Sequence, residues 1–165
     1  LYYIAGKVQD EVPNVSGLSN VVSATTTAPP DTTAPADIAD LAVVSSTPNS
    51  ITVTFTAPGD DGATGQATVY DLRFSTAPIT AFNFATATPF PVAAPAFAGT
   101  TEAFAVTGLT PATTYYFAVR TGDEVPNYSG LSNVVSGVTA TPPPTTTAFV
   151  RMLRDNLLRH IRLPR

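Results

Sequence analysis

Carboxylates in two predicted loops are the side chains best suited to chemistry in this chain. Asp60 and Asp61 lie in the loop PGDDG, and Asp123 and Glu124 lie in the loop DEVPN. If these loops meet at one end of the fold, they could offer Ca²⁺ the oxygen ligands that it requires. Both are also ordinary turn sequences, since turns prefer Asp, Asn, Gly and Pro. We favour plain turns, and we predict neither a metal nor any other cofactor.

The other reactive residue types do not form a catalytic set. His160 is the only histidine and there is no cysteine, so His-based triads and Cys-based metal sites are excluded. Serine and threonine are plentiful, but without a base none is an activated nucleophile. An open loop does not by itself predict, for one carboxyl of a pair, the raised pKa that acid catalysis needs. The sequence therefore predicts a protein that is not an enzyme.

Three short patterns suggest binding or modification, and each has a simpler interpretation. Arg120–Asp123 reads RTGD, but Thr121 separates the arginine from the glycine, so it is not the integrin-type tripeptide. Asn14 and Asn127 each begin an Asn-x-Ser pattern, which we interpret as a turn rather than a glycosylation site. Tyr116 and Tyr128 are the aromatic residues expected on the surface. Without any tryptophan they make a weak platform for a sugar.

The chain repeats itself, and the repeat determines how we divide it. Residues 1–27 align with residues 114–140 without a gap, and 17 of the 27 positions are identical. An internal repeat spaced by about one small domain indicates an array of modules. We therefore expect a piece of a longer tandem protein, in which residues 1–23 are the last two strands of a preceding module.

Two Thr/Pro-rich segments, 24–35 and 140–148, bracket the region between the repeats. Such sequences favour extended polyproline II and behave as semi-rigid spacers. We therefore predict two linkers around one complete module at 36–139.

Alternation with a period of two predicts strands in that module. In SITVTFTAP, Ile51, Val53 and Phe55 share one face and threonines share the other. Similar alternation occurs in TVYDLRFST, TEAFAVTGL and TTYYFAVRT, with turn residues between the runs. About seven short strands of this kind predict an all-β fold, an antiparallel seven-stranded sandwich. We expect the following residues in its core: Ile38, Leu41, Val53, Phe55, Tyr70, Leu72, Phe104, Val106, Leu109, Tyr115, Phe117 and Val119.

Residues 76–100 contain repeated prolines, which make a long strand there improbable. We expect a short helical turn near ITAFNFAT and one edge strand.

Residues 36–139 resemble an immunoglobulin-like sandwich of the fibronectin type III family. The most specific likeness is GLTPATTYYFAVRT, which matches the family's L-x-P-x-T-x-Y pattern as Leu109, Pro111, Thr113 and Tyr115. The resemblance places the Tyr115 ring in the core and its hydroxyl on upstream backbone, as a tyrosine corner. Phe55 stands where the family usually has tryptophan, and Tyr70 and Leu72 match core positions of the third strand.

The resemblance also implies a role and a location. The amino-acid sequence of the repeats is similar to that of modules in large secreted bacterial proteins. It implies a non-catalytic spacer or display module that is extracellular or at the cell surface, with neighbouring domains of the same polypeptide as partners. The alternative is an adhesion module that binds carbohydrate or protein through the loops at one pole. The resemblance places the Asp60–Asp61 and Asp123–Glu124 loops at the same pole.

The charge of the chain is unevenly distributed. Residues 1–147 carry three basic and eleven acidic side chains, whereas residues 148–165 carry five arginines and one aspartate. The acidic body excludes a nucleic-acid binder. In the tail, 149–165, an apolar residue recurs at every fourth position, which is typical of a basic amphipathic helix: Phe149, Leu153, Leu157 and Ile161. The abrupt change in composition favours a tail foreign to the module, with His160 as a solvated residue.

Residues 1–23 form a hairpin with no core of its own, because Tyr2 and Ile4 align with Tyr115 and Phe117. An isolated hairpin is marginal in water. It frays, pairs with an exposed edge strand of the module, or replaces the matching hairpin in another copy. We expect weak, concentration-dependent self-association through residues 1–23.

Overall fold

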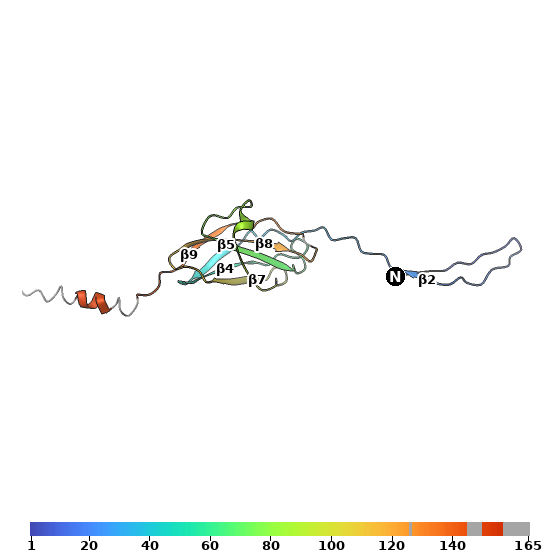
Figure 1. The fold of residues 1–165 in the computed structure, drawn as a ribbon. Coiled ribbons are helices and arrows are strands. Elements are labelled where there is room, and N and C mark those ends of the chain that lie inside the picture. Colours follow the sequence, from blue (N-terminus) through green and yellow to red (C-terminus); the bar gives the residue numbers. More distant parts are fainter. Residues whose placement is uncertain (126, 145–149, 157–165) are drawn as a thin grey trace, which may run out of the picture. The chain divides into compact units, whose positions relative to one another are not determined.

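The computed structural model describes residues 1–125, 127–144 and 150–156. The chain divides into two compact units, Leu1–Asp31 and Thr32–Arg165. Figure 1 shows the elements within each unit.

The second unit is an antiparallel β-sandwich. Its three-stranded sheet has the order β3-β4-β7, with β3 at Ala42–Ser46, β4 at Ser50–Thr56 and β7 at Thr101–Thr107. The four-stranded sheet has the order β6-β5-β8-β9, with β6 at Thr88–Phe90, β5 at Val69–Ser75, β8 at Thr114–Gly122 and β9 at Val135–Val138. The predicted all-β fold, a seven-stranded antiparallel sandwich, is confirmed.

Strand β4 shows why these residues form a sandwich. Ile51, Val53 and Phe55 are buried, while the threonines between them lie on the half-exposed side. A β-strand points successive side chains to opposite faces, so the alternation places every apolar residue of β4 between the sheets. The β-branched residues also suit the pleated backbone.

The core cluster joins both sheets. Phe55 meets Tyr70 edge-on at a ring-centroid distance of 5.0 Å, and Phe104 lies 5.8 Å from Phe55. Phe104 is only partly buried at the margin of the cluster, whereas Ile51 is fully buried within it. The cluster comprises Ile38, Leu41, Ile51, Val53, Phe55, Tyr70, Leu72, Val106, Leu109, Tyr115, Phe117 and Val119.

A second, smaller cluster lies on the outer face of the four-stranded sheet. The 3-10 helix η1, Phe84–Thr86, carries Phe84 against Ala118 of β8, and Ile79 and Ala87 complete the cluster. The guanidinium carbon of Arg73 lies 5.1 Å from the Phe84 ring centroid. Figure 1 shows η1 outside the sheet. The helical turn and edge strand expected between 76 and 100 are both present, as η1 and β6.

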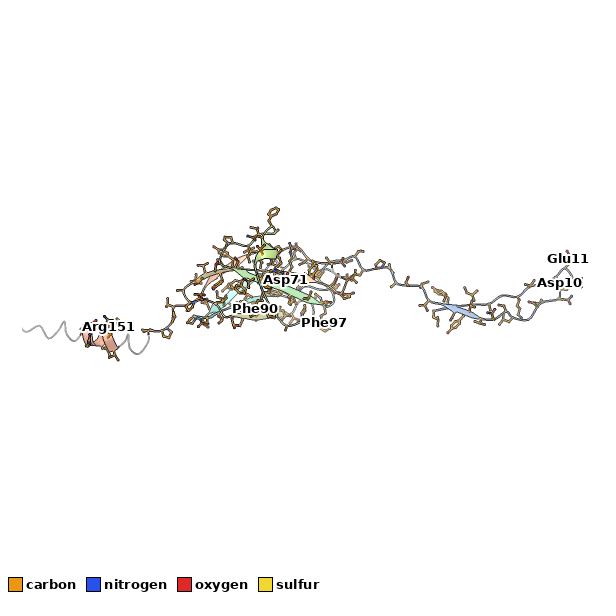
Figure 2. The ribbon with its side chains drawn as sticks, in the orientation of Figure 1. Asp10, Glu11, Asp71, Phe90, Phe97 and Arg151 are labelled. Carbon is orange, nitrogen blue, oxygen red and sulfur yellow. The ribbon has the colours of Figure 1, made fainter. Side chains whose placement is uncertain are left out.

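The first unit is a two-stranded hairpin. Strand β1, Tyr2–Ile4, pairs antiparallel with β2, Val22–Ala24. A long loop joins them, and Figure 2 shows Asp10 and Glu11 at its tip.

A helical segment covers 150–156. The remaining positions of the predicted amphipathic tail lie outside the described residues: Phe149, Leu157, Arg159, His160, Ile161 and Arg162. Within the part of the chain that the structure describes, no helix is long and apolar enough to cross a membrane.

Candidate functional site

The chain enters the sandwich along a backbone bridge at what we call the N-terminal pole. Ala36 donates its N–H to the carbonyl of Gly62 at 3.0 Å, and Gly62 donates to the carbonyl of Ala34 at 3.1 Å. Gly62 has a φ of 61°, a left-handed conformation that glycine adopts without strain. The incoming segment is therefore fixed to the turn that follows β4.

Polar side chains then attach this segment to the loop between β8 and β9. Asp37 accepts a hydrogen bond from the N–H of Gly130 at 2.6 Å. Asn133 accepts from the N–H of Leu41 at 3.0 Å and donates its side-chain amide to the carbonyl of Leu41 at 2.8 Å. The backbone of Asn133 also donates to Ile38 at 3.2 Å. These bonds join the first and last parts of the module across more than 90 residues of chain.

The chain leaves at the opposite end, the C-terminal pole, under similar restraint. Ala140 donates its N–H to the carbonyl of Thr47 at 3.0 Å. The buried Thr139 hydroxyl donates to the carbonyl of Thr110 at 2.6 Å. The Tyr115 hydroxyl accepts from the N–H of Thr110 at 3.0 Å, which forms the tyrosine corner. Pro111 begins the turn before β8 and is partly buried, and Leu109 is in the core.

Strand β4 separates the two poles. The Gly62 turn follows its last residue, Thr56, whereas Thr47 precedes its first residue, Ser50. Seven residues of strand span about 20 Å. Within this unit the chain therefore enters at one end of the sandwich and leaves at the other (Figure 1).

The predicted acidic loops do approach each other at the N-terminal pole. The pKa of Asp60 is raised above its usual value, first by desolvation and then by the nearby carboxyl of Glu124, with smaller effects from Asp123 and Asp61. One carboxylate oxygen of Asp60, Oδ1, is buried without a hydrogen-bond partner. Asp60 therefore lies within electrostatic reach of the other three candidates from sequence.

Each of these loops is organised by hydrogen bonds within the loop itself. Asp60 and Asp61 both donate their N–H groups to the carbonyl of Thr64, at 2.7 and 3.2 Å. Asp123 is buried, and its two carboxylate oxygens accept the backbone and side-chain N–H groups of Asn127 at 2.9 and 2.8 Å. Among the described residues, no group of three or more His, Cys, Asp or Glu is arranged to hold a metal ion.

An open groove of about 450 Å³ lies at the edge of the four-stranded sheet, lined by Val69, Tyr70, Asp71, Leu72, Pro89, Phe90, Pro91 and Tyr128. Tyr128, which is 53% exposed, is the most accessible aromatic residue in this lining. Asp71 is paired with the Nε of Arg73 at 2.8 Å, so its charge is already compensated. The lining is mainly apolar, and Figure 2 marks Asp71 and Phe90.

The surface aromatics differ in part from those expected from sequence. Tyr128 is exposed, but Tyr116 is only half-exposed because it packs against the Phe84 cluster. Within residues 36–139, Phe82 and Phe97 are more exposed than Tyr128, and the sequence pattern does not single them out. Figure 2 labels Phe97. The RTGD segment is unsuited to capture a receptor, since Thr121 and Asp123 are buried.

Comparisons with known proteins place this geometry in a family. A family model described as "Purple acid Phosphatase, N-terminal domain" matches residues 36–139. The chain is 36% identical over 142 residues to "Chitinase A1" of Niallia circulans, and 34% identical over 143 residues to "Exoglucanase B" of Cellulomonas fimi. These alignments cover 84% and 86% of the chain, but it spans only 17% and 12% of those relatives.

The chain is also similar to solved structures. A human fibronectin type III domain, the sixth of fibronectin type III domain containing protein 3, aligns at 20% identity with a TM-score of 0.48. It covers 69% of this chain and 93% of its own. A second structure, described as the fibronectin type-III domain of human fibronectin type III domain containing protein 3, aligns at 16% identity over 71% of this chain and 97% of its own, with a TM-score of 0.46. The chain belongs to the family described as the purple acid phosphatase N-terminal domain, and its residues 36–139 form a β-sandwich of the fibronectin type III kind.

Proposed function

We propose that this chain is a non-catalytic spacer that connects and separates the domains of a larger extracellular polypeptide. The observation that carries the proposal is the path of the chain through the second unit. It enters at the Gly62 turn and leaves beside Thr47, at opposite ends of β4. A module of this topology adds its own length to the distance between its neighbours.

Restraint at both poles supports the same role. A spacer keeps its neighbours apart only if the chain cannot peel away from its ends. Here backbone bonds to Ala36 and Ala140 hold both ends, and side chains such as Asn133 reinforce the N-terminal one. The Thr/Pro-rich segment 24–35 extends the spacing, by about 3 Å per residue where it is polyproline II.

The relatives support a connecting role through their differences. By name they include a chitinase, an exoglucanase and an endoglucanase, and the family name refers to a phosphatase. A segment that enzymes with such different names share, and that makes up less than a fifth of the named relatives, is a poor candidate for their individual chemistries. Polymers such as chitin are degraded outside cells, which favours an extracellular location.

The similarity also supports a tandem arrangement. The alignment to the chitinase covers 84% of the chain, which is more than residues 36–139 alone. Similarity therefore continues into the flanking residues, as an array of modules requires.

The second candidate is a module that binds carbohydrate or protein. The groove beside Tyr128 favours it, because an exposed aromatic ring over an apolar floor is a surface on which a sugar ring stacks. Loops at the N-terminal pole, with Phe97 exposed nearby, offer another surface.

Sedimentation with insoluble chitin and cellulose separates the two functions. The spacer proposal expects the full chain to stay in the supernatant, as Tyr128→Ala does. Retention of the native chain that Tyr128→Ala abolishes would replace the spacer with a binding module. Phe82→Ala is the matched control, since it removes an exposed ring from outside the groove.

A further inference from the structure

The only two basic residues of the module, Arg73 and Arg120, lie on the outer face of the four-stranded sheet. Their guanidinium carbons are 5.1 and 5.0 Å from the centroid of the Phe84 ring, which belongs to the cluster on that face. A cation–π contact orients a guanidinium group but leaves its in-plane N–H donors available for other partners. The hydrogen bonds of each arginine therefore have to be considered separately.

The two arginines differ in their partners. Arg73 donates from Nε to Asp71 at 2.8 Å and from Nη1 to the carbonyls of Ala85 and Ala87 at 2.7 and 3.3 Å. Within the residues that the structure describes, the side chain of Arg120 has no hydrogen bond or ion pair, and its Nε is buried. A partly buried charge has lost some of its hydration, which costs free energy unless a partner compensates it. Arg120 is the arginine that lacks this compensation.

The nearest carboxylate on the same face is already paired. Asp71 lies directly opposite Arg120 in the register of β5 and β8, at a separation that favours a pair of opposite charges. It bonds instead to Arg73, two residues along its own strand. The three side chains together carry one net positive charge, which comes from Arg120.

An aromatic side chain lies on each side of Arg120 along β8. Ala118 and Gly122, two residues before and after it, face the same side of the sheet. Phe84 packs against Ala118. A Cβ atom at Gly122 would lie 2.8 Å from Cε1 of Tyr128, so the side chain of Tyr128 packs directly over this glycine. Arg120 therefore occupies the position between the buried Phe84 and the exposed Tyr128.

We propose that Arg120 and Tyr128 form a binding site for a sugar that carries a carboxylate, of the uronic acid type. A guanidinium group binds a carboxylate through two parallel N–H···O bonds, which supply the missing charge and fix the orientation of the ligand. The sugar ring packs against the exposed side chain of Tyr128. The groove that Asp71 and Tyr128 line opens beside this position and has room for the ring.

A carboxylate on a sugar ring is the ligand that uses both features. A simple carboxylate reaches only Arg120, and a neutral sugar reaches only Tyr128. One charge-assisted pair and one ring contact correspond to a dissociation constant on the order of 10⁻³ M for a monosaccharide. The inference does not depend on the spacer function, which rests on the path of the chain. Chitin and cellulose carry no carboxylate, so their failure to bind leaves this proposal intact.

Chemical-shift titration of the full chain by NMR tests the proposal with glucuronate, glucose and acetate as probes. We expect glucuronate to shift the amide signals of Arg120 and Gly122 with saturation, and glucose and acetate to bind at least about ten-fold more weakly. Arg120→Gln should weaken glucuronate binding at least about ten-fold. Arg154→Gln is the matched control, because it removes the same charge from a side chain that is 70% exposed outside the module.

Each alternative result is decisive. A native chain whose amide signals do not shift with glucuronate overturns the proposal, as does an Arg120→Gln chain that binds it like the native one. Acetate that binds as tightly as glucuronate would exclude a role for the sugar ring, and glucose that does so would exclude a role for the charge. The amide spectrum also shows whether Arg120→Gln is folded. If it is not, Tyr128→Ala takes its place, and unchanged glucuronate binding in that variant overturns the site.

Discussion

The side-chain amide of Asn133 holds both backbone groups of Leu41, accepting from its N–H at 3.0 Å and donating to its carbonyl at 2.8 Å. In this way Asn133 takes the place of a strand partner for the first segment of the module. Its counterpart in the repeat, Asn20, is exposed in a unit that has no such segment. The same residue type is thus structural in one copy of the repeat and solvated in the other.

Replacing this amide should therefore destabilise the module selectively. Asn133→Ala leaves the N–H and carbonyl of Leu41 without their partners in a partly buried site, which costs about 2 kcal/mol. Asn20→Ala is the control and should leave the unfolding midpoint unchanged. Urea denaturation followed by tyrosine fluorescence measures both. Equal stability of the two variants would contradict the role assigned to Asn133.

Removing the hydroxyl group should affect stability differently at two buried tyrosines. Tyr115→Phe leaves the N–H of Thr110 without its acceptor, which costs about 1–2 kcal/mol. The Tyr70 hydroxyl is buried without a hydrogen-bond partner, and burial, together with the nearby Glu102 carboxylate, raises its pKa. Tyr70→Phe should therefore be neutral or slightly stabilising. Urea denaturation of both variants gives their free energies of unfolding. A larger loss of stability in Tyr70→Phe than in Tyr115→Phe would refute the prediction.

The Asp60 carboxyl should make stability depend on pH. Because desolvation and Glu124 raise its pKa in the folded state, the folded state binds this proton more tightly than the unfolded chain does. Its favourable contribution is present in acid and is lost as the pH rises through the folded-state pKa. Asp60→Asn should melt above the native chain at pH 7, and the gain should shrink below the ordinary pKa of 3.8.

A second substitution identifies the source of that effect. Because Glu124 is the leading charge acting on Asp60, the gain from Asp60→Asn should be smaller in a Glu124→Gln background. Thermal melts of the four chains at both pH values give the comparison. A gain that is independent of pH would show that the carboxyl is not the cause.

Calcium should not stabilise the module. Hydrogen bonds within each loop account for the Asp60 and Asp123 loops without a ligand, and the Asp123 oxygens are already occupied by Asn127. A ligand that binds only the folded state raises the melting temperature with its concentration. We expect no change at millimolar Ca²⁺. A rise of several degrees that Asp60→Ala with Asp61→Ala abolishes would establish a metal site.

The sandwich could be predicted from sequence because its signals are local and repeated. Alternation in β4 and the pattern ending in Tyr115 each occupy fewer than ten residues. The Phe84 cluster was missed, since it needs a small residue, Ala118, on the outer face of a strand more than 30 residues away. Short-range periodicity carries no information about such a contact.

The hydrogen bonds of Asn133 could not be predicted from the sequence either. A single polar residue in SNVVS has no period, and its partner Leu41 lies 92 residues away. The repeat does mark this asparagine as identical in both copies, although identity alone does not separate a structural residue from a turn residue. Fold class follows from short-range pattern, whereas the polar attachments at the poles follow only from tertiary geometry.

The central claim is that the module holds its two chain ends apart, and a distance measurement tests it most directly. The chain has no cysteine, so Ala36→Cys with Ala140→Cys can carry a pair of spin labels, one at each pole. Double electron–electron resonance should give one narrow distance well beyond about 20 Å, the length of β4. Ala36→Cys with Ala63→Cys labels one pole twice and should give a clearly shorter distance. A broad distribution for the first pair, or a distance as short as that of the control, would contradict the spacer account.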